Sequence, residues 1–383
     1  MQRDGVGYYR PELDVLRFLA FLFVFLHHAF PSEASAYSAF GEMPANIISS
    51  LVVAGGLGVD LFFVLSAFLI TKLLLIEEQR TDRLDVPSFL TRRALRIWPL
   101  YFAFLFASVY LIPHLLPGPG EDLGQHFYWF LAFLGNWACV LYGYPPSVAA
   151  PLWSVSVEEQ FYLAWPIVLI AVGTRRIVPV ACSLLLLACA VRVVLWLKGA
   201  PHTAVWANTF ARLDPIAVGI LLAWLSERRP LTITSRWRLA LAMVGLILPP
   251  AAIFILGKDA FHGSGSLALY PVVALGGGLL VFAVAFSPGS RSRWITNRAL
   301  IHLGRVSYGL YVFHVLAIHI VMRYGDRYVP SLWRIEEGLL RTAAHAGLGL
   351  LLTVALAVVS YQFLERPFLK LKQRFTAVRS APV

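Results

Sequence analysis

Apolar segments of about 20 residues recur along the whole chain, and they limit the folds that it can adopt. Hydrophobic residues make up 58% of the 383 residues and charged residues only 14%, where a soluble domain has roughly 25% charged residues. A helix of about 20 residues crosses the hydrocarbon core of a bilayer. The sequence therefore predicts an all-α, polytopic integral membrane helical bundle. The candidate segments lie near 13–30, 51–76, 97–116, 126–143, 153–173, 177–197, 206–225, 239–256, 267–287, 303–322 and 342–364.

Basic residues gather between these segments, where they indicate topology. Lys and Arg collect in cytoplasmic loops, so all the clusters should face one side, and they do if one segment between 97 and 173 does not cross. The most polar segment there is 126–143. We therefore predict about ten transmembrane helices, one re-entrant or interfacial segment, and cytoplasmic N- and C-termini in the cell (inner) membrane. The loop 323–338, which mixes basic and acidic residues, is an exception. The clusters lie at 80–96, 175–176, 228–238, 291–305 and 366–379.

Nothing in the sequence indicates a second domain or a metal centre. Residues 1–383 are expected to form a single membrane-embedded domain without an appended soluble domain. The net charge of +11 is accounted for by the topology clusters, so nucleic-acid binding is not expected. Cys139, Cys182 and Cys189 have neither CxxC nor Cys/His spacing and are expected to be small core residues.

The first apolar segment carries Arg17 and His28, eleven residues apart. At about 100° and 1.5 Å per residue, the two side chains share one face of the helix, about 16 Å apart. Ionisable groups within a span usually face the bundle interior or a watery cavity. The spacing suits a ligand that needs a cation at one end and a near-neutral base at the other, as acyl-coenzyme A does; structural hydrogen bonding is the alternative. His27 points about 100° away and is expected to be structural.

Two more segments carry charges next to a span. Asp60 follows a glycine-rich stretch, and it either holds Arg17 or a histidine in place or is a plain helix-end residue. Three arginines begin the segment that follows. They are expected either to fix the orientation of the helix in the membrane or to bind the phosphates of the donor, for which planar guanidinium groups are suited. These residues are Arg92, Arg93 and Arg96.

The stretch "LWSVSVEEQFY" places Trp153, Ser154 and Glu158 at the mouth of a span. A serine followed by acids is typical of a helix start. The same residues also suit a sugar-binding rim or a carboxylate partner for His28.

The stretch "LGRVSYGLYVFH" places Tyr308, Tyr311 and His314 on one helix. Ser307, Tyr311 and His314 share a face because they are spaced at i, i+4 and i+7.

Taken together, these stretches resemble the acyltransferase-3 family of integral membrane, acyl-coenzyme A dependent O-acyltransferases. The resemblance covers nearly the whole chain, including "LDVLRFLAFLFVFLHH", "GVDLFFVLSAFLI", "RRALRIWPLY" and "ERPFLK". The family's Arg-x10-His pattern falls on Arg17 and His28, which implies that His28 is the catalytic histidine. Its arginine-rich loop and WSxxxE stretch fall on Arg92, Arg93, Arg96, Trp153, Ser154 and Glu158. Ala67 stands where the family usually has glycine.

The resemblance implies transfer of an acyl group, most simply acetyl, from cytoplasmic acyl-coenzyme A to a hydroxyl of a carbohydrate-containing acceptor. Acyl-coenzyme A is a co-substrate here, and no permanently bound cofactor is expected. His28 either takes the proton of the acceptor hydroxyl or is itself acylated as a relay, and both routes stay open. Arg17 anchors the donor, and a carboxylate such as Glu158 or Asp14 orients a partner. Candidate acceptor or supporting residues are Asp14, Asp60, Ser66, Trp153, Ser154, Tyr308, Tyr311 and His314.

The expected partners are acyl-coenzyme A, the acceptor and the lipid bilayer, with a homo-oligomer left open. A transporter or flippase, with buried charges along a substrate path, is the main rival, but no two-half symmetry supports it. A non-enzymatic scaffold is disfavoured by the clustered ionisable groups.

The topology is testable by cysteine labelling of intact cells. Because basic loops face the cytoplasm, an impermeant maleimide should reach cysteines introduced at 118–122 and 258–264, and it should not reach those at 82–88 or 230–235. Labelling at 82–88 would contradict the predicted orientation.

Overall fold

The computed structural model describes residues 8–116, 123–228, 233–286, 297–328 and 338–375, and within them it is helical, with no strand. Short 3₁₀ turns and a π-helical turn at Tyr361–Glu365 join the helices. The α-helices are α1 (Pro11–Ala29), α2 (Glu42–Gly55), α3 (Gly58–Thr81), α4 (Val86–Tyr110), α5 (Ile112–Leu115), α6 (Phe127–Leu131), α7 (Gly135–Tyr142), α8 (Leu152–Val172), α9 (Ile177–Leu197), α10 (His202–Trp206), α11 (Asp214–Arg228), α12 (Ser235–Leu256), α13 (Ser266–Ala285), α14 (Arg298–Arg305), α15 (Ser307–Tyr328), α16 (Leu339–Ser360) and α17 (Arg366–Lys372).

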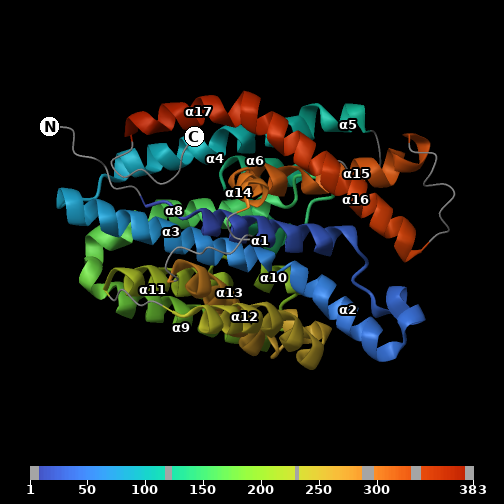
Figure 1. The fold of residues 1–383 in the computed structure, drawn as a ribbon, viewed down its shortest axis with the longest axis horizontal. Helices are drawn as coiled ribbons and strands as arrows, with labels where there is room; N and C mark the ends of the chain where they lie inside the picture. Colours follow the sequence, from blue (N-terminus) through green and yellow to red (C-terminus); the bar gives the residue numbers. More distant parts are fainter. Residues whose placement is uncertain (1–7, 117–122, 229–232, 287–296, 329–337, 376–383) are drawn as a thin grey trace.

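Helix α1 runs through the middle of the molecule. It packs against α2, α3, α13, α14, α15 and α16, and Figure 1 shows it between the layer of α16 and α17 and the layer of α11 to α13. The helix begins with Pro11, which suits the first helical position, and acidic residues occupy its first turn. It ends at Ala29 because Phe30 precedes a proline and takes an extended conformation.

The outer helices expose apolar side chains. Only 22% of the most apolar stretch of α9 and 17% of that of α12 is buried inside the protein. Leu186 and Ile255 are 72% and 78% exposed. An apolar surface of this extent is unstable in water but suits contact with lipid tails. The arrangement is that of a helical membrane protein.

Six helices in the described part of the chain are long and apolar enough to cross a membrane, or eight if each of two bent pairs forms one span. The predicted number of ten exceeds this because α4 carries three arginines and α11 has 15 residues. By length and composition alone, these two helices therefore do not qualify as membrane spans.

The segment 51–76, which we predicted as one span, lies within one candidate span, Glu42–Thr81, that a short turn divides into two helices. Helix α2 ends at Gly55 and α3 starts at Gly58. A Cβ atom on Gly55 would lie 2.5 Å from the Phe23 carbonyl oxygen, and one on Gly58 would lie 2.5 Å from that of Ala20. These glycines allow the backbone on both sides of the turn to pass directly against α1.

The segment 126–143 forms the short helices α6 and α7, of five and eight residues. Neither is long enough to cross a bilayer, which agrees with a segment that does not span. Several residues used for the topology lie outside the described residues: the loop 118–122, Arg229, Arg291, Arg293, Arg334 and Arg379.

The start of α1 and the end of α17 lie toward the same end of the molecule (Figure 1). At this end Arg92, near the start of α4, donates a hydrogen bond to the Phe375 carbonyl oxygen at 2.7 Å. The common position of the two described chain ends is consistent with an even number of crossings.

Helices α3 and α11 form the most extensive helix pair. A Cβ atom on Gly219 would lie 2.5 Å from the Val64 carbonyl oxygen and 2.8 Å from the Ala67 side chain. Ala67, at the position where the resemblance led us to expect glycine, is fully buried. It therefore fills the α3–α11 contact.

Replacing Gly219 by Ala should destabilise the protein, because the added methyl group meets backbone atoms that cannot move away. We expect a loss of about 1–3 kcal/mol, measured as a lower thermal unfolding temperature in detergent. Gly347 is the matched control: it is helical in α16, and nothing lies within 4 Å of its Cβ position. Gly347→Ala should be neutral or slightly stabilising. Equal unfolding temperatures for the two variants would contradict this packing.

Candidate active site

Two cavities lie along α1, one toward each of its ends. The first, which we call the histidine cavity, has a volume of about 410 Å³. The second, the cation cavity, has a volume of about 80 Å³. The histidine cavity is lined by residues that include His27, His28, Val59, Tyr144, Pro151, Trp153, His202, Trp206 and Tyr311. The cation cavity is lined by residues that include Arg17, Val59, Phe62, Ser66, Arg93, Arg96, Ser154, Glu158, Tyr162, Ser307, Tyr308 and Tyr311.

Arg17 and His28 thus line different cavities although they share one helix. Arg17 is held by Asp14, three residues earlier, with 2.8 Å between guanidinium and carboxylate atoms. The same carboxylate accepts a hydrogen bond from the Tyr9 hydroxyl at 3.0 Å. Asp14 therefore acts as the anchor of Arg17, in keeping with its predicted supporting position.

His28 is oriented by a single backbone contact. Its Nδ1 atom lies 2.8 Å from the Val24 carbonyl oxygen. Since a carbonyl oxygen only accepts, Nδ1 carries the hydrogen and Nε2 carries the lone pair. Among the residues that the structure describes, no carboxylate lies within hydrogen-bonding distance of His28.

His314 lies directly beside His28. The ring centroids are 4.9 Å apart and the planes meet at 74°. His314 is fully buried, and its Nδ1 donates to the Tyr311 carbonyl oxygen at 2.5 Å. Its Nε2 finds no partner within the described chain. Sequence spacing placed His314 near the site, and the structure adds its contact with the candidate base.

His27 does not turn away from this cavity, contrary to our expectation from the helix angle. Its ring lies 5.1 Å from that of His28 and contributes to the same wall. The reason is the break between α2 and α3, since the bare backbone at Gly56 leaves room for the His27 ring. Its Nδ1 lies 3.1 Å from the Val52 carbonyl oxygen, so one ring nitrogen serves the packing against α2.

The cation cavity brings together three guanidinium groups, from Arg17, Arg93 and Arg96. Arg93 also lies over the Tyr162 ring, 5.4 Å from its centroid. With Glu158 as the acidic group in the lining, the cavity carries a surplus of positive charge. Several planar guanidinium groups placed together in this way are suited to binding phosphate groups through paired hydrogen bonds.

Arg92 is directed elsewhere. It forms an ion pair with Glu77 of α3, at 2.7 Å, and bonds to the Phe375 carbonyl oxygen. Its side chain leaves α4 on the side that faces the end of α3. Of the four predicted donor-binding arginines, Arg17, Arg93 and Arg96 therefore line the cavity, whereas Arg92 links α4 to α3.

Glu158 lies in the cation cavity, where it accepts hydrogen bonds from Ser66 and Tyr162, both at 2.8 Å. The structure therefore does not place it as the carboxylate partner of His28. Ser66, a predicted supporting residue, positions this carboxylate. Tyr162, the last residue of the stretch "LWSVSVEEQFY", also contacts Glu158.

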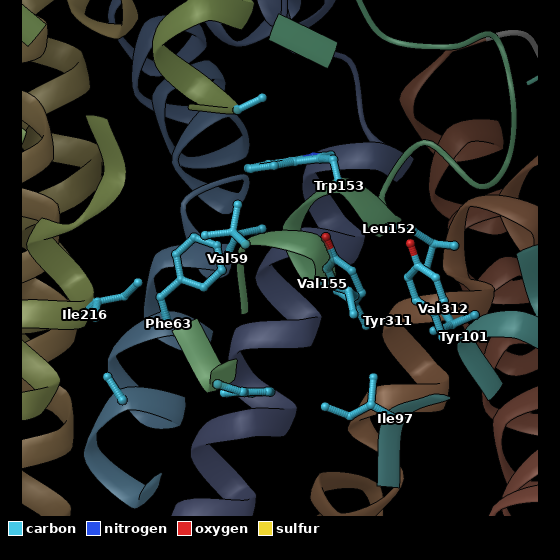
Figure 2. Close-up of a cluster of buried hydrophobic side chains, with 14 of the residues drawn as sticks. Val59, Phe63, Ile97, Tyr101, Leu152, Trp153, Val155, Ile216, Tyr311 and Val312 are labelled. Atoms are coloured by element: carbon cyan, nitrogen blue, oxygen red, sulfur yellow. The ribbon is translucent and has the colours of Figure 1, made fainter. Parts of the chain in front are cut away.

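Trp153, Ser154 and Tyr311 lie where the two cavities meet. Trp153 lines the histidine cavity and Ser154 the cation cavity. The hydroxyl groups of Ser154 and Tyr311 are 2.7 Å apart. Figure 2 shows Trp153, Val155 and Tyr311 in the same buried cluster as Val59. Tyr308, from the same helix as Tyr311, lines the cation cavity and donates to the Ile97 carbonyl oxygen at 3.0 Å.

Asp60 does not hold Arg17 or a histidine, which was one of the two roles that the sequence left open for it. It pairs with Arg212 at 2.6 Å, and both side chains are at most 2% exposed. A second buried pair joins Arg192 and Asp214 at 2.5 Å. Sequence reasoning missed these arginines, although charges within apolar segments were the available signal.

Aromatic residues form much of the histidine cavity. The Arg212 guanidinium group lies 4.3 Å from the centroid of the Trp206 ring. The His202 ring stacks on the same Trp206 ring, with 5.4 Å between the ring centroids. Burial and the nearby Arg212 charge lower the pKa of His202 to about 4. His202 is therefore neutral at physiological pH. We did not identify His202, Trp206 or Tyr144 from the sequence.

The arrangement combines a cationic pocket, a base and an aromatic wall. In the described part of the chain, no group of three or more His, Cys, Asp or Glu side chains is placed to hold a metal ion. The geometry suits binding of an elongated anionic ligand with its reactive end at His28.

Comparison with known proteins gives a consistent result. The family model described as "Acyltransferase domain" (acyltransferase-3) matches residues 10–362. The chain is 26% identical to "Peptidoglycan O-acetyltransferase OatA" of Listeria monocytogenes over 385 residues, which is 94% of this chain and 56% of that protein. It is also 26% identical to "O-acetyltransferase OatA" of Staphylococcus aureus over 386 residues, 94% of this chain and 57% of that protein.

The chain thus spans little more than half the length of these relatives. No solved structure matches it. The family model covers nearly the whole helical bundle, including α1 with both of its cavities. The chain therefore belongs to the acyltransferase-3 family.

Proposed function

We propose that this protein is a membrane-bound O-acyltransferase that moves an acyl group, most simply acetyl, from acyl-coenzyme A to a hydroxyl of a carbohydrate-containing acceptor. The observation that carries the proposal is the placement of Arg17 and His28 on one helix, in two cavities that meet at shared residues. The names of the relatives as O-acetyltransferases support the reaction class, and peptidoglycan in one of those names supports a glycan acceptor.

The donor phosphates bind at the arginine end, on the cytoplasmic side of the cell membrane. Arg17, Arg93 and Arg96 supply planar forks that match phosphate oxygens. The cation cavity, at about 80 Å³, is smaller than the roughly 300–1,000 Å³ of a ligand pocket. We therefore place the nucleotide at its mouth and only the slender arm of the donor inside.

The thioester end reaches the histidine cavity, where His28 Nε2 is the base. The acceptor oxygen attacks the thioester carbon while Nε2 takes its proton, and the carbon–sulfur bond then breaks. The proton returns from the imidazolium to the thiolate, which leaves as coenzyme A. The Val24 carbonyl supports this cycle because it fixes the tautomer throughout and accepts from the charged ring as well.

The acceptor binds in the same cavity, against its aromatic wall. Trp153, Trp206 and Tyr144 offer apolar faces with polar edges, which suit the alternating apolar and hydroxyl surfaces of a sugar ring. The volume of about 410 Å³ accommodates a sugar unit next to His28.

The relay route uses the same nitrogen. In that route Nε2 attacks the thioester carbon, coenzyme A leaves, and the acceptor hydroxyl then takes the acyl group from the imidazole. Exchange of labelled coenzyme A into acetyl-coenzyme A without acceptor marks the relay, and its absence marks direct transfer.

His28→Ala should abolish transfer but leave donor binding intact. A general base supplies about 10²–10⁴-fold, so turnover of acetyl-coenzyme A with soluble peptidoglycan fragments should fall to roughly 1% or less. His27→Ala is the control, because the Val52 contact commits one of its nitrogens to packing, and it should lose less than about tenfold. Near-normal turnover of His28→Ala, in protein with an unchanged unfolding temperature, would overturn the assignment.

The donor site can be tested within one arginine cluster. Arg93→Gln and Arg96→Gln should each raise the Kd of coenzyme A by about 10- to 100-fold, the value of one charged hydrogen bond. Arg92→Gln should leave this Kd within about threefold, because Arg92 is engaged by Glu77. Equal effects of all three changes would show that only the general positive charge of the loop matters.

A further inference from the structure

The two cavities share a narrow set of wall residues. Among the residues that the structure describes, Val59 and Tyr311 are the two that line both cavities. These two side chains therefore lie between the arginine end and the histidine end of the site. Figure 2 shows Val59 on α3 and Tyr311 on α15, the helix that also carries His314.

Tyr311 is fixed in this position. Its hydroxyl group lies 2.7 Å from the Ser154 hydroxyl and 3.1 Å from the Pro151 carbonyl oxygen. Its ring packs at 5.8 Å from the ring of Phe62 and at 5.3 Å from that of His314. Two hydrogen bonds and two ring contacts leave the side chain little freedom to move aside.

Val59 is fixed as well, by the backbone that carries it. It follows Gly58, where an added Cβ atom would lie 2.5 Å from the Ala20 carbonyl oxygen of α1. Val59 itself is 5% exposed. Because this turn of α3 cannot retreat from α1, the Val59 methyl groups form a stiff wall opposite Tyr311.

We propose that Val59 and Tyr311 form a gate that selects the length of the acyl group on the donor. This inference rests on the proposed function, since it concerns how acyl-coenzyme A reaches His28. A slender thioester with a short acyl group passes between the two side chains. The acyl group precedes the arm between these two side chains, so a longer acyl chain contacts their rigid walls along more of its length. Packed interiors resist added methylene groups in this way.

Three buried valines provide a matched test. Val59 lines both cavities, Val155 lines only the cation cavity and Val24 only the histidine cavity. Each change to Ala removes the same atoms. The measurement is the Kd of coenzyme A, acetyl-coenzyme A and hexanoyl-coenzyme A for the purified full chain, so no acceptor is needed.

For the wild-type protein we expect hexanoyl-coenzyme A to bind at least tenfold more weakly than acetyl-coenzyme A. Val59→Ala should reduce this ratio to about threefold or less, whereas Val155→Ala and Val24→Ala should keep it. Tyr311→Phe, which loses the bonds to Ser154 and Pro151, should shift the ratio in the same direction as Val59→Ala.

The outcomes separate the gate from the proposed function. If the wild-type protein does not bind coenzyme A or acetyl-coenzyme A, the proposed function fails. If it binds both but the ratio is near one, or if the three valine variants change it equally, the gate is wrong and the proposed function stands.

Discussion

The central position of α1 is the constraint on which the rest of the structure depends. Six other helices pack around it, so its ionisable side chains are surrounded by protein. Such groups are costly in a membrane interior unless they are paired or face a cavity. Asp14 satisfies Arg17, and the Val24 carbonyl satisfies one nitrogen of His28. The other hydrogen-bonding groups of Arg17 and His28 face the two cavities, where a ligand can reach them.

The glycines around α1 and α3 make this arrangement sterically accessible. Gly55 and Gly58 bring the break between α2 and α3 against the α1 backbone, and the break opens the wall of the histidine cavity where His27 lies. Gly219 lets α11 pack onto α3, and α11 follows Arg212, the partner of Asp60. Breaking a buried pair by removing one partner costs about 3–5 kcal/mol. The Asp60–Arg212 pair therefore holds the cavity wall through Trp206.

The sequence was most informative where the signal is local. The shared face of Arg17 and His28 follows from helix geometry, and the polar character of 126–143 marks a segment that divides into short helices. The pairing of Asp60 with Arg212 and that of Glu158 with Ser66 were not predictable, because these partners lie 152 and 92 residues away. The divergence of Arg92 from Arg93 and Arg96 depends on Glu77 of another helix. The position of His27 depends on the α2–α3 break, which hydrophobicity alone did not reveal.

The central claim is that one donor molecule lies along α1, with phosphates at the arginines and its thioester at His28. The most direct measurement is an experimental structure of the protein with a non-hydrolysable thioether analogue of acetyl-coenzyme A. The account predicts phosphate oxygens within hydrogen-bonding distance of Arg93 or Arg96, the arm between Val59 and Tyr311, and the acyl carbonyl beside His28 Nε2. An analogue whose acyl end lies outside the histidine cavity would contradict it.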